Sequence, residues 1–226
     1  MLKLTIEKND LAAYVERQLS HFFPDGQVTR RTLLPYIDNA LQRLTYCFSH
    51  IKLKYYFDGK YVLFNHLNTD QYAMFLYFLS NSIYKAGGDL ILASKVYALN
   101  KALHAIDVFY EVQLPDICLF SHPVGTVLGR GKFSNYFVIY QHCTVGSNLD
   151  GIYPRLGEGV VMYCGSGVIG NCTVGNNCWL SVATQVLDMD LPSDSIAFGK
   201  SPDIVIKPTG RNVVRDIFGI RVTCAP

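Results

Sequence analysis

The chain has 226 residues, of which 50% are hydrophobic, including 15 Tyr and 13 Phe, so it can bury the core of one large domain or of two smaller ones. Its 20 Lys and Arg residues are scattered along the sequence and, with 18 acidic residues, leave a net charge of +2. This pattern argues against a nucleic-acid surface, which needs a basic stripe. The seven cysteines form no Cys-x-x-Cys pair and show no metal-ligand spacing with histidine, so we expect reduced thiols in a reducing compartment and no metal.

Two stretches bear on membrane insertion and export. The first ten residues contain no long apolar run and charges follow at once, so we expect no signal peptide there. The apolar run 72–83 is too short for a bilayer, which takes about 20 residues. Together these features predict a cytoplasmic protein without a membrane partner.

The first 110 residues show the spacing of apolar residues that is typical of helices. We expect a first helix, capped by Asn9 or Asp10, that stops before Pro24. The other expected elements are a helix over about 32–51, a hairpin over 55–64 around Asp58-Gly59, a helix over 69–85, and a helix from the cap Asp89 to about 106. Residues 1–110 are therefore predicted to form an α-helical cap and oligomerisation domain.

From position 156 onward an apolar residue returns at every sixth position. These residues are Leu156, Met162, Val168, Val174, Leu180 and Val186. Four positions after the first five come mostly small residues, namely Val160, Ser166, Cys172, Cys178 and Thr184. A period of six fits neither a helix nor a simple strand, but it is typical of a parallel β-helix of hexapeptide repeats, with the apolar residue inside the prism. The chain is thus predicted to be an α + β protein with a helical domain followed by a β-helix over 111–208.

The same phase continues upstream at Val127, Phe133, Ile139 and Val145. Between Val145 and Leu156 the step is 11 residues instead of 12, so the rhythm slips by one. We expect residues 147–155 to leave the wall as a loop that carries binding groups, or to form a one-residue bulge. The segment 209–226 follows neither periodicity, and we expect it to form a C-terminal tail.

The strongest candidate for chemistry is the segment Ser121 to Gly129, which contains His122. Imidazole has an unperturbed pKa of about 6.5 and suits proton abstraction near neutral pH. A hydroxyl acceptor becomes a good nucleophile only when a base removes its proton. A carboxylate that holds the other ring nitrogen improves such a base, and Asp107 and Asp116 lie upstream.

The stretch from His122 to Gly129 resembles the His-x-x-Gly-x-Val-x-Gly line of serine acetyltransferases and of the wider class of left-handed β-helix acyltransferases. Further blocks agree with this family in order and spacing. They are 140–146, 154–160, 165–171 and 190–199, so the resemblance covers about residues 107–208. The resemblance implies a left-handed β-helix that uses acetyl-CoA as co-substrate, without a metal, and that assembles as a homotrimer whose helical caps can pair trimers.

The resemblance also implies roles for single residues. His122 falls on the general base, and Asp107, fifteen positions earlier, falls on the acidic residue that pairs with it. In the family acetyl-CoA lies in the groove between neighbouring prisms. The positions that line this groove correspond to Gly146, Gly165, Ser166, Ala183 and Thr184. Lys200 and Lys207 either bind the CoA phosphates or are solvated surface lysines.

The sequence departs from the family around the acceptor. Ser121 replaces the Asp that precedes the catalytic His, and the loop ends in Ile152-Tyr153-Pro154 where the family has Arg-His-Pro. Without these charged partners the acceptor amino acid is harder to bury, so Tyr153 is a candidate to stack on a sugar and Arg155 to contact a carboxylate. His142 either lines the acceptor side or is a structural surface residue.

The leading hypothesis is an acetyl-CoA-dependent O-acetyltransferase whose acceptor is either serine or a sugar hydroxyl of a capsule or surface-polysaccharide precursor. The alternative is a non-catalytic hexapeptide-repeat scaffold or partner subunit. A metal-dependent hydratase on the same fold would need three metal-binding histidines, and the predicted prism contains only His122 and His142.

Overall fold

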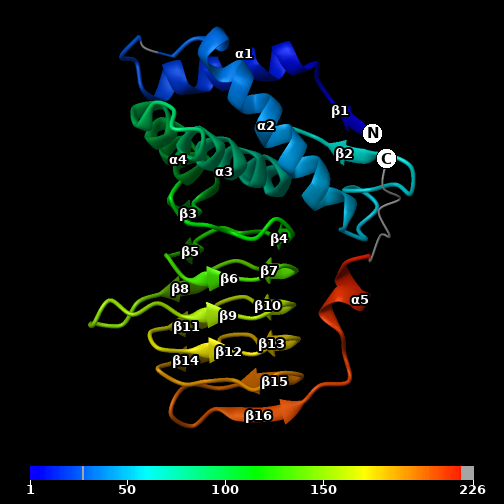
Figure 1. The fold of residues 1–226 in the computed structure, drawn as a ribbon, viewed down its shortest axis with the longest axis vertical. Helices are drawn as coiled ribbons and strands as arrows, with labels where there is room; N and C mark the ends of the chain where they lie inside the picture. Colours follow the sequence, from blue (N-terminus) through cyan, green and yellow to red (C-terminus); the bar gives the residue numbers. More distant parts are fainter. Residues whose placement is uncertain (27, 220–226) are drawn as a thin grey trace.

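The computed structural model describes residues 1–26 and 28–219, in which helices stand at one end of a stack of short strands (Figure 1). The helical end contains α1 (Lys8–Phe22), α2 (Arg30–Ser49), α3 (Thr69–Lys85) and α4 (Leu90–His104). A two-stranded parallel sheet of β1 (Leu2–Leu4) and β2 (Val62–Phe64) joins this end. No helix within the described residues combines the length and the apolar character needed to cross a bilayer.

Helix α3 is the centre of the helical end and packs against both α2 and α4. Its residues from Gln71 to Ile83 are all buried, which explains why this helix is apolar nearly all round. The helix predicted over 69–85 is found with these bounds. The cap predicted at Asp89 is also confirmed, because its side chain accepts a hydrogen bond from the Ile91 amide.

One local expectation in the helical end is wrong. Helix α1 starts directly after Glu7, so neither Asn9 nor Asp10 caps it; both lie inside its first turn.

The hairpin expected over 55–64 is present as a short turn. The Asp58 amide donates to the Tyr61 carbonyl at 3.2 Å, and Phe57 and Val62 form one antiparallel bridge. The second strand of this turn, β2, also pairs in parallel with β1, which the local pattern did not predict.

The strands of the second half form three walls of a prism. One wall contains β3 (Asp107–Val108), β5 (Val127–Leu128), β8 (Thr144–Gly146), β11 (Gly167–Ile169) and β14 (Gln185–Leu187). The second contains β4 (Cys118–Phe120), β7 (Phe137–Ile139), β10 (Val160–Met162), β13 (Cys178–Leu180), β15 (Ser195–Phe198) and β16 (Val205–Pro208). The third contains β6 (Lys132–Phe133), β9 (Arg155–Leu156) and β12 (Thr173–Val174). All pairs are parallel except β15 with β16, which closes the far end.

The six-residue ladder points into the prism as predicted. The apolar positions from Leu156 to Val186 are at most 3% exposed, and the small residues between Val160 and Thr184 at most 2%. Upstream the predicted phase is wrong at Val127, which is 43% exposed. Leu128 is buried in its place and pairs with Val145, so the rhythm slips by one residue here as well.

One corner of the prism is built from residues in the left-handed backbone region. This corner column consists of Ala105, Gly125, His142, Gly165 and Ala183, with φ between 51° and 72°. The amide of each of the last four donates to a carbonyl of the coil before it at 2.9–3.0 Å, as when Gly125 donates to Ala105. The column therefore stacks successive coils in register, and it lies next to His122.

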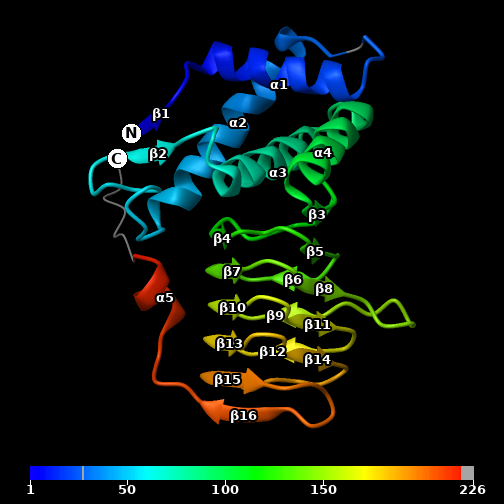
Figure 2. The ribbon, with the colours of Figure 1, turned by 180° about the vertical axis from the view of Figure 1, so that it is seen from behind.

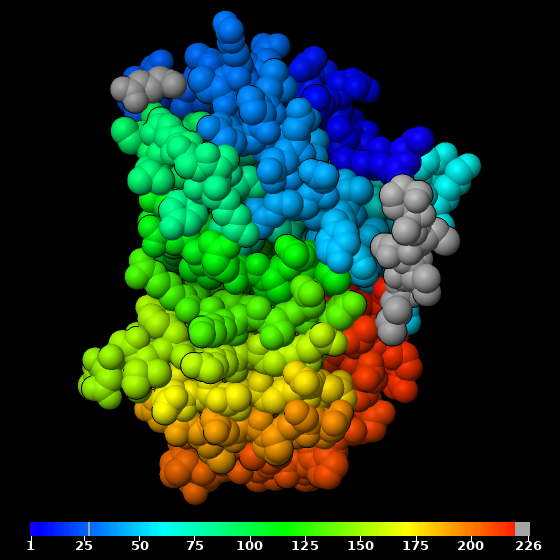
Figure 3. All heavy atoms as spheres, viewed as in Figure 1, coloured from blue at the N-terminus to red at the C-terminus, as the bar shows by residue number. Residues whose placement is uncertain are grey.

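The loop predicted from the slip in the rhythm is present between β8 and β9. It stands out from the surface as the yellow-green projection in Figure 3. Leu149 at its tip is fully exposed, and Asn148 holds its base by accepting hydrogen bonds from the Asp150 and Ile152 amides at 3.1 Å each. The structure thus selects a loop over a simple bulge.

After β16 the chain turns back along the outside of the prism to the helical end, where α5 (Val213–Ile217) lies beside the coils (Figure 2). The buried apolar residues of the helical end and of the prism form one continuous core. This core fixes the helices on the first coils, and the candidate site lies along that junction. The part of the predicted tail beyond Gly219, including Cys224, lies outside the described residues.

Candidate functional site

His122 occupies the corner between β4 and β5, in the first complete coil below the helices. Its φ is 51°, and its carbonyl accepts a hydrogen bond from the Val124 amide at 2.8 Å in a tight turn around Pro123. A non-glycine residue in this region is uncommon and is held by its surroundings. The side chain is 77% exposed, so the ring is free to meet a substrate.

The carboxylate beside His122 is Asp70, from the first turn of α3. Asp70 Oδ2 accepts a hydrogen bond from the His122 amide at 3.1 Å and lies 3.8 Å from His122 Nδ1. Asn68 caps the helix by accepting from the Gln71 amide, and the helix N-terminus favours a negative charge at Asp70. The Asp70 side chain is only 18% exposed, so the pair lies at the edge of the interior.

Sequence reasoning missed Asp70 because 52 residues separate it from His122. The available signal was an Asp at the start of a well-predicted helix behind the cap Asn68. That signal gives the helix N-terminus but not its neighbour in space. Only the docking of α3 on the first coils brings the two side chains together.

The predicted pairing of Asp107 with His122 is not what the structure shows. Asp107 Oδ1 accepts from the Tyr97 hydroxyl at 2.7 Å, and Oδ2 from Lys101 Nζ at 2.6 Å. Burial alone would raise the pKa of Asp107, but the hydrogen bonds from Lys101 and Tyr97 outweigh it and leave the pKa below its usual value. Two donors on α4 thus engage this carboxylate. Asp116, the other upstream carboxylate, precedes β4.

Two cavities meet at Asp70 and His122. The larger, of about 380 Å³, lies between the segment after α2 and the coil that carries β4; we call it the tyrosine cavity. Its walls include Leu53, Tyr55, Tyr56, Asp70, Ser121 and His122. The smaller, of about 260 Å³, is bounded by the end of α4 and by Pro123. A substrate that reaches His122 therefore contacts both the helical end and the prism.

The Asp70 carboxylate affects the pKa of a phenol in the tyrosine cavity. Burial raises the pKa of the Tyr56 phenol well above its usual value, and the nearby Asp70 carboxylate raises it further. Tyr56 therefore stays protonated at neutral pH.

The predicted acceptor residues lie at different corners. His142 belongs to the corner column, and its ring covers Gly125: a Cβ on Gly125 would lie 2.3 Å from His142 Nδ1. Tyr153 packs over Gly129, and Arg155 is an exposed residue of β9 on the third wall. His142 therefore lies near the turn of His122, whereas Tyr153 and Arg155 lie further along the same coil, beyond its next wall.

The residues predicted to line a CoA groove divide into two kinds. Ser166 and Thr184 are buried, and the amide and the carbonyl of each already take part in hydrogen bonds between or within the coils, so these two residues lie behind the surface. Gly165 and Ala183 belong to the corner column, and Gly146 ends β8 on the adjacent wall. These backbones share one corner and one wall.

The two predicted phosphate-binding lysines are exposed but lie on different walls. The main chain of Lys200 forms a parallel β-bridge with Gln185 of β14. The main chain of Lys207 pairs with Ile196 in the wall that β16 closes. Lys207 Nζ also lies 5.8 Å from the centre of the Phe198 ring. Lys200 therefore shares the wall of Gly146, and Lys207 does not.

The thiols of the prism are structural. All six cysteines within the described residues are free. Burial raises the pKa of Cys143, Cys172 and Cys178, which keeps these thiols protonated and poorly nucleophilic. Within the same residues no group of three His, Cys, Asp or Glu side chains is arranged to hold a metal ion.

Comparison with known proteins gives a consistent set of relatives, although no family model matches the chain. It is 24% identical over 146 residues to a serine acetyltransferase of Staphylococcus xylosus and 29% identical over 119 residues to one of Synechococcus elongatus. These matches cover 63% and 51% of this chain but only 66% and 48% of the relatives, less than two thirds of their length.

Solved structures extend the likeness over most of the chain. The serine acetyltransferase of Neisseria gonorrhoeae in complex with serine superposes with a TM-score of 0.66 at 20% identity, over 90% of this chain and 84% of that one. A serine acetyltransferase in complex with CoA gives a TM-score of 0.65 at 18% identity, over 89% and 85%. The chain has the serine acetyltransferase fold. The predicted α + β class, helices followed by a left-handed β-helix, and the resemblance to serine acetyltransferases are thereby confirmed.

Proposed function

We propose that the protein is an acetyl-CoA-dependent O-acetyltransferase with His122 as its general base. The observation that carries this proposal is an exposed imidazole beside Asp70, at the meeting point of two cavities in a serine acetyltransferase fold. The sequence relatives are named serine acetyltransferases, and one structural neighbour is a complex with CoA. A non-catalytic scaffold would have no need for this arrangement.

In the proposed reaction His122 takes the proton of the acceptor hydroxyl as its oxygen attacks the thioester carbonyl carbon. The C–S bond then breaks, the acetyl group remains on the acceptor oxygen, and the proton passes to the leaving sulfur of CoA. Asp70 holds the main chain of His122 and stabilises the imidazolium that forms. In this scheme Asp70 takes the part that the sequence assigned to Asp107.

The CoA groove is proposed along the corner column and the adjacent wall. Gly146, Gly165 and Ala183 would line the groove with small residues, and the buried Ser166 and Thr184 would support it from behind. Lys200, on the same wall, fits a phosphate of CoA better than Lys207 does. CoA carries its charge on phosphates, for which a lysine ammonium is a suitable point charge.

The acceptor is proposed to be a small hydroxyl compound, either serine or a sugar. Serine is supported by the neighbour solved as a serine complex. A sugar is supported by the volume of the tyrosine cavity, by its aromatic wall, and by Ile152 and Tyr153 in place of charged loop residues. Acetyl transfer assayed with L-serine and with a panel of nucleotide sugars separates the two.

A homotrimer is proposed, with acceptor groups from two chains at each site. The wall of β5 and β14 and its corner expose four apolar residues, namely Val124, Val127, Val182 and Leu187, each between 43% and 62%. An apolar stripe of this kind is typical of a subunit interface. In such an assembly His142, Tyr153 or Arg155 of one chain would serve the His122 of another, and the helical ends would pair trimers.

We also propose that the protein works in a reducing compartment such as the cytoplasm, which the free thiols support.

The chain is proposed to consist of a helical domain over 1–110, a β-helix domain over 111–208 and a tail from 209. Strand β3 and the shared core join the first two parts.

Replacing His122 by Ala tests the proposed function. Loss of a general base is expected to lower kcat by about 10²- to 10⁴-fold, while the dissociation constant for CoA stays nearly unchanged because other residues line the proposed groove. The release of CoA thiol with each acceptor measures the first quantity, and titration calorimetry the second.

The matched control is His21→Ala, an exposed histidine of α1, which should behave as the wild type. Full activity of His122→Ala would overturn the assignment of the base. A wild-type protein that binds no CoA would leave the scaffold alternative in place.

A further inference from the structure

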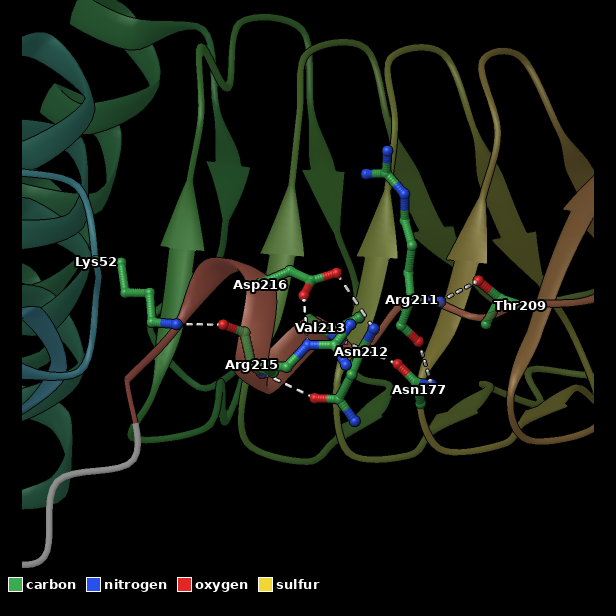
Figure 4. Close-up of polar contacts among 8 residues, drawn as sticks. All are labelled: Lys52, Asn177, Thr209, Arg211, Asn212, Val213, Arg215 and Asp216. Carbon is green, nitrogen blue, oxygen red and sulfur yellow. Dashed lines mark hydrogen bonds and ion pairs between the residues drawn. The ribbon is translucent and has the colours of Figure 1, made fainter.

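The segment from Thr209 to Gly219 returns from the far end of the prism to the helices and passes one corner of each coil on the way (Figure 4). We call this segment the strap. The corner that it follows is formed by Tyr136, Gly159, Asn177 and Asp194, all in the left-handed backbone region with φ between 53° and 70°. This second corner is distinct from the corner column beside His122.

Hydrogen bonds join the strap to two of these coils. The Thr209 amide donates to the Asp194 carbonyl at 2.9 Å. Asn177 then holds the strap twice, since its Nδ2 donates to the Arg211 carbonyl at 2.9 Å and its Oδ1 accepts from the Val213 amide at 3.0 Å. These bonds align the strap with the coil spacing.

Apolar anchors follow at the next two coils. Val213 is fully buried against Gly159, where a Cβ on the glycine would lie 3.3 Å from the Val213 Cβ. Phe218 is also fully buried, and its ring centre lies 5.3 Å from that of Tyr136. Helix α5 begins at Val213 and ends just before Phe218. Its N-cap is Asn212, whose side chain accepts a hydrogen bond from the Arg215 amide at 2.8 Å. The strap is therefore a packed element of the fold.

Its upper end is joined to the segment that follows α2. The Lys52 amide donates to the Ile217 carbonyl at 3.1 Å, and the Gly219 amide donates to the His50 carbonyl at 2.7 Å. The Lys52 ammonium also donates to the Arg215 carbonyl, as Figure 4 shows. Three hydrogen bonds thus hold residues 50–52 to the strap.

Residues 50–52 lead directly into one wall of the tyrosine cavity, which Leu53, Tyr55 and Tyr56 form opposite His122. On its other side this wall is held by Gln71, the neighbour of Asp70, which donates to the Tyr55 carbonyl at 2.9 Å. The wall is therefore clamped between α3 and the strap. Only a short segment therefore separates the strap contacts at residues 50–52 from this wall.

We propose that the strap is a positioning element for the acceptor: it fixes the distance between the Leu53–Tyr56 wall and His122, and so sets how the acceptor lies against the base. This inference rests on the proposed function. Because precise placement of a reacting group changes rates strongly, a small movement of this wall would alter the use of the acceptor more than the binding of CoA.

Phe218→Ala tests this proposal, because it removes the anchor nearest to Lys52 and leaves the proposed catalytic groups unchanged. We expect hydrogen exchange of residues 52–57 to become at least about tenfold faster, as the Lys52 amide loses its fixed acceptor. The KM for L-serine, or for a nucleotide sugar if serine is not used, should rise about tenfold, with the dissociation constant for CoA changed less than about twofold.

The matched control is Arg215→Ala, since the Arg215 side chain is 66% exposed and only its carbonyl contacts Lys52. This variant should match the wild type in exchange and in KM. If Phe218→Ala does not fold, Lys52→Met removes the ammonium contact alone and should show the same two changes in a smaller degree.

The outcomes are distinguishable. Unchanged exchange over 52–57 in the folded variants would overturn the strap as a clamp. Faster exchange with an unchanged acceptor KM would overturn its role in positioning the acceptor. If the wild type transfers no acetyl group at all, the proposed function fails, whereas the exchange experiment still decides whether the strap holds this wall.

Discussion

At the scale of residues, we expect His104 to make the stability of the fold depend on pH. It ends α4, lines the smaller cavity beside Pro123, and is 9% exposed, with Nδ1 2.8 Å from Asn100 Oδ1. Burial lowers the pKa of His104 to about 4, against about 6.5 in an unfolded chain. The folded state therefore holds a neutral imidazole at pH 5, where the unfolded chain holds a proton.

The sign of the pH effect follows from this difference. Because the unfolded state binds the proton more tightly, stability falls as pH drops from about 6.5 towards 4. Between pH 7 and pH 5 we expect His104 to account for a loss of about 2 kcal/mol, or roughly 4–8 °C in Tm. The His104→Gln variant should lose several degrees less than the wild type over this range in thermal melts. An equal loss in both proteins would contradict the assignment.

At the scale of elements, two candidates supply a carboxylate near the base: helix α3 with Asp70, and strand β3 with Asp107. The geometry favours α3, since Asp70 contacts His122 while Asp107 binds Tyr97 and Lys101 of α4. Asp107 therefore serves mainly to join α4 to the first wall. The helical end is then part of the proposed site as well as a cap.

Asparagine variants separate these elements. Asp70→Asn should lower kcat/KM by about 10- to 100-fold, because it removes the charge beside the imidazolium while keeping the shape. Asp107→Asn should lower Tm with a smaller loss of kcat/KM, because it weakens the contact with α4. A larger kinetic loss in Asp107→Asn than in Asp70→Asn would restore Asp107 as the partner of the base.

At the scale of the whole molecule, one wall of the prism exposes apolar side chains. The wall formed by β3, β5, β8, β11 and β14 carries Val127 on β5, next to the strand nearest the helices, and Leu187 on the end strand β14, and these two residues are 43% and 51% exposed. A parallel β-helix presents such a wall as a flat surface, which suits self-association about a three-fold axis. The proposed CoA groove borders the same wall, so the proposed trimer would couple assembly to activity.

Leu187→Glu tests this coupling. A carboxylate buried at each dry interface has no partner there, so we expect the variant to form monomers where the wild type forms trimers, and to lose CoA binding. Light scattering after size-exclusion chromatography measures the mass of the assembly. The control Leu149→Glu, at the exposed tip of the loop, should leave the mass unchanged. A wild type that is already monomeric would contradict the proposed trimer.

Much of the prism could be predicted because its signal is local and repeated. Each hexad places an apolar residue and a small residue at fixed positions, so the ladder from Leu156 to Val186 predicts its own burial. Near the helices the repeat is interrupted, and there the prediction at Val127 is wrong by one residue, because Leu128 pairs with Val145. The signal for helix α3 is also local, because its cap and its apolar run follow one another directly in the sequence.

The sequence by itself determined the period of the prism, the bounds of α3, the loop after β8 and the position of His122, since each depends on residues that are neighbours in the chain. The tertiary structure alone decided that Asp70 lies beside His122, that Asp107 turns to Lys101, and that Phe218 returns to the end of α2. These pairs are separated by 52 residues, 6 residues and more than 160 residues. Even the short pair depends on how α4 docks on the first coil. Their energies come from the packing of helices and strap on the prism, which no local pattern encodes.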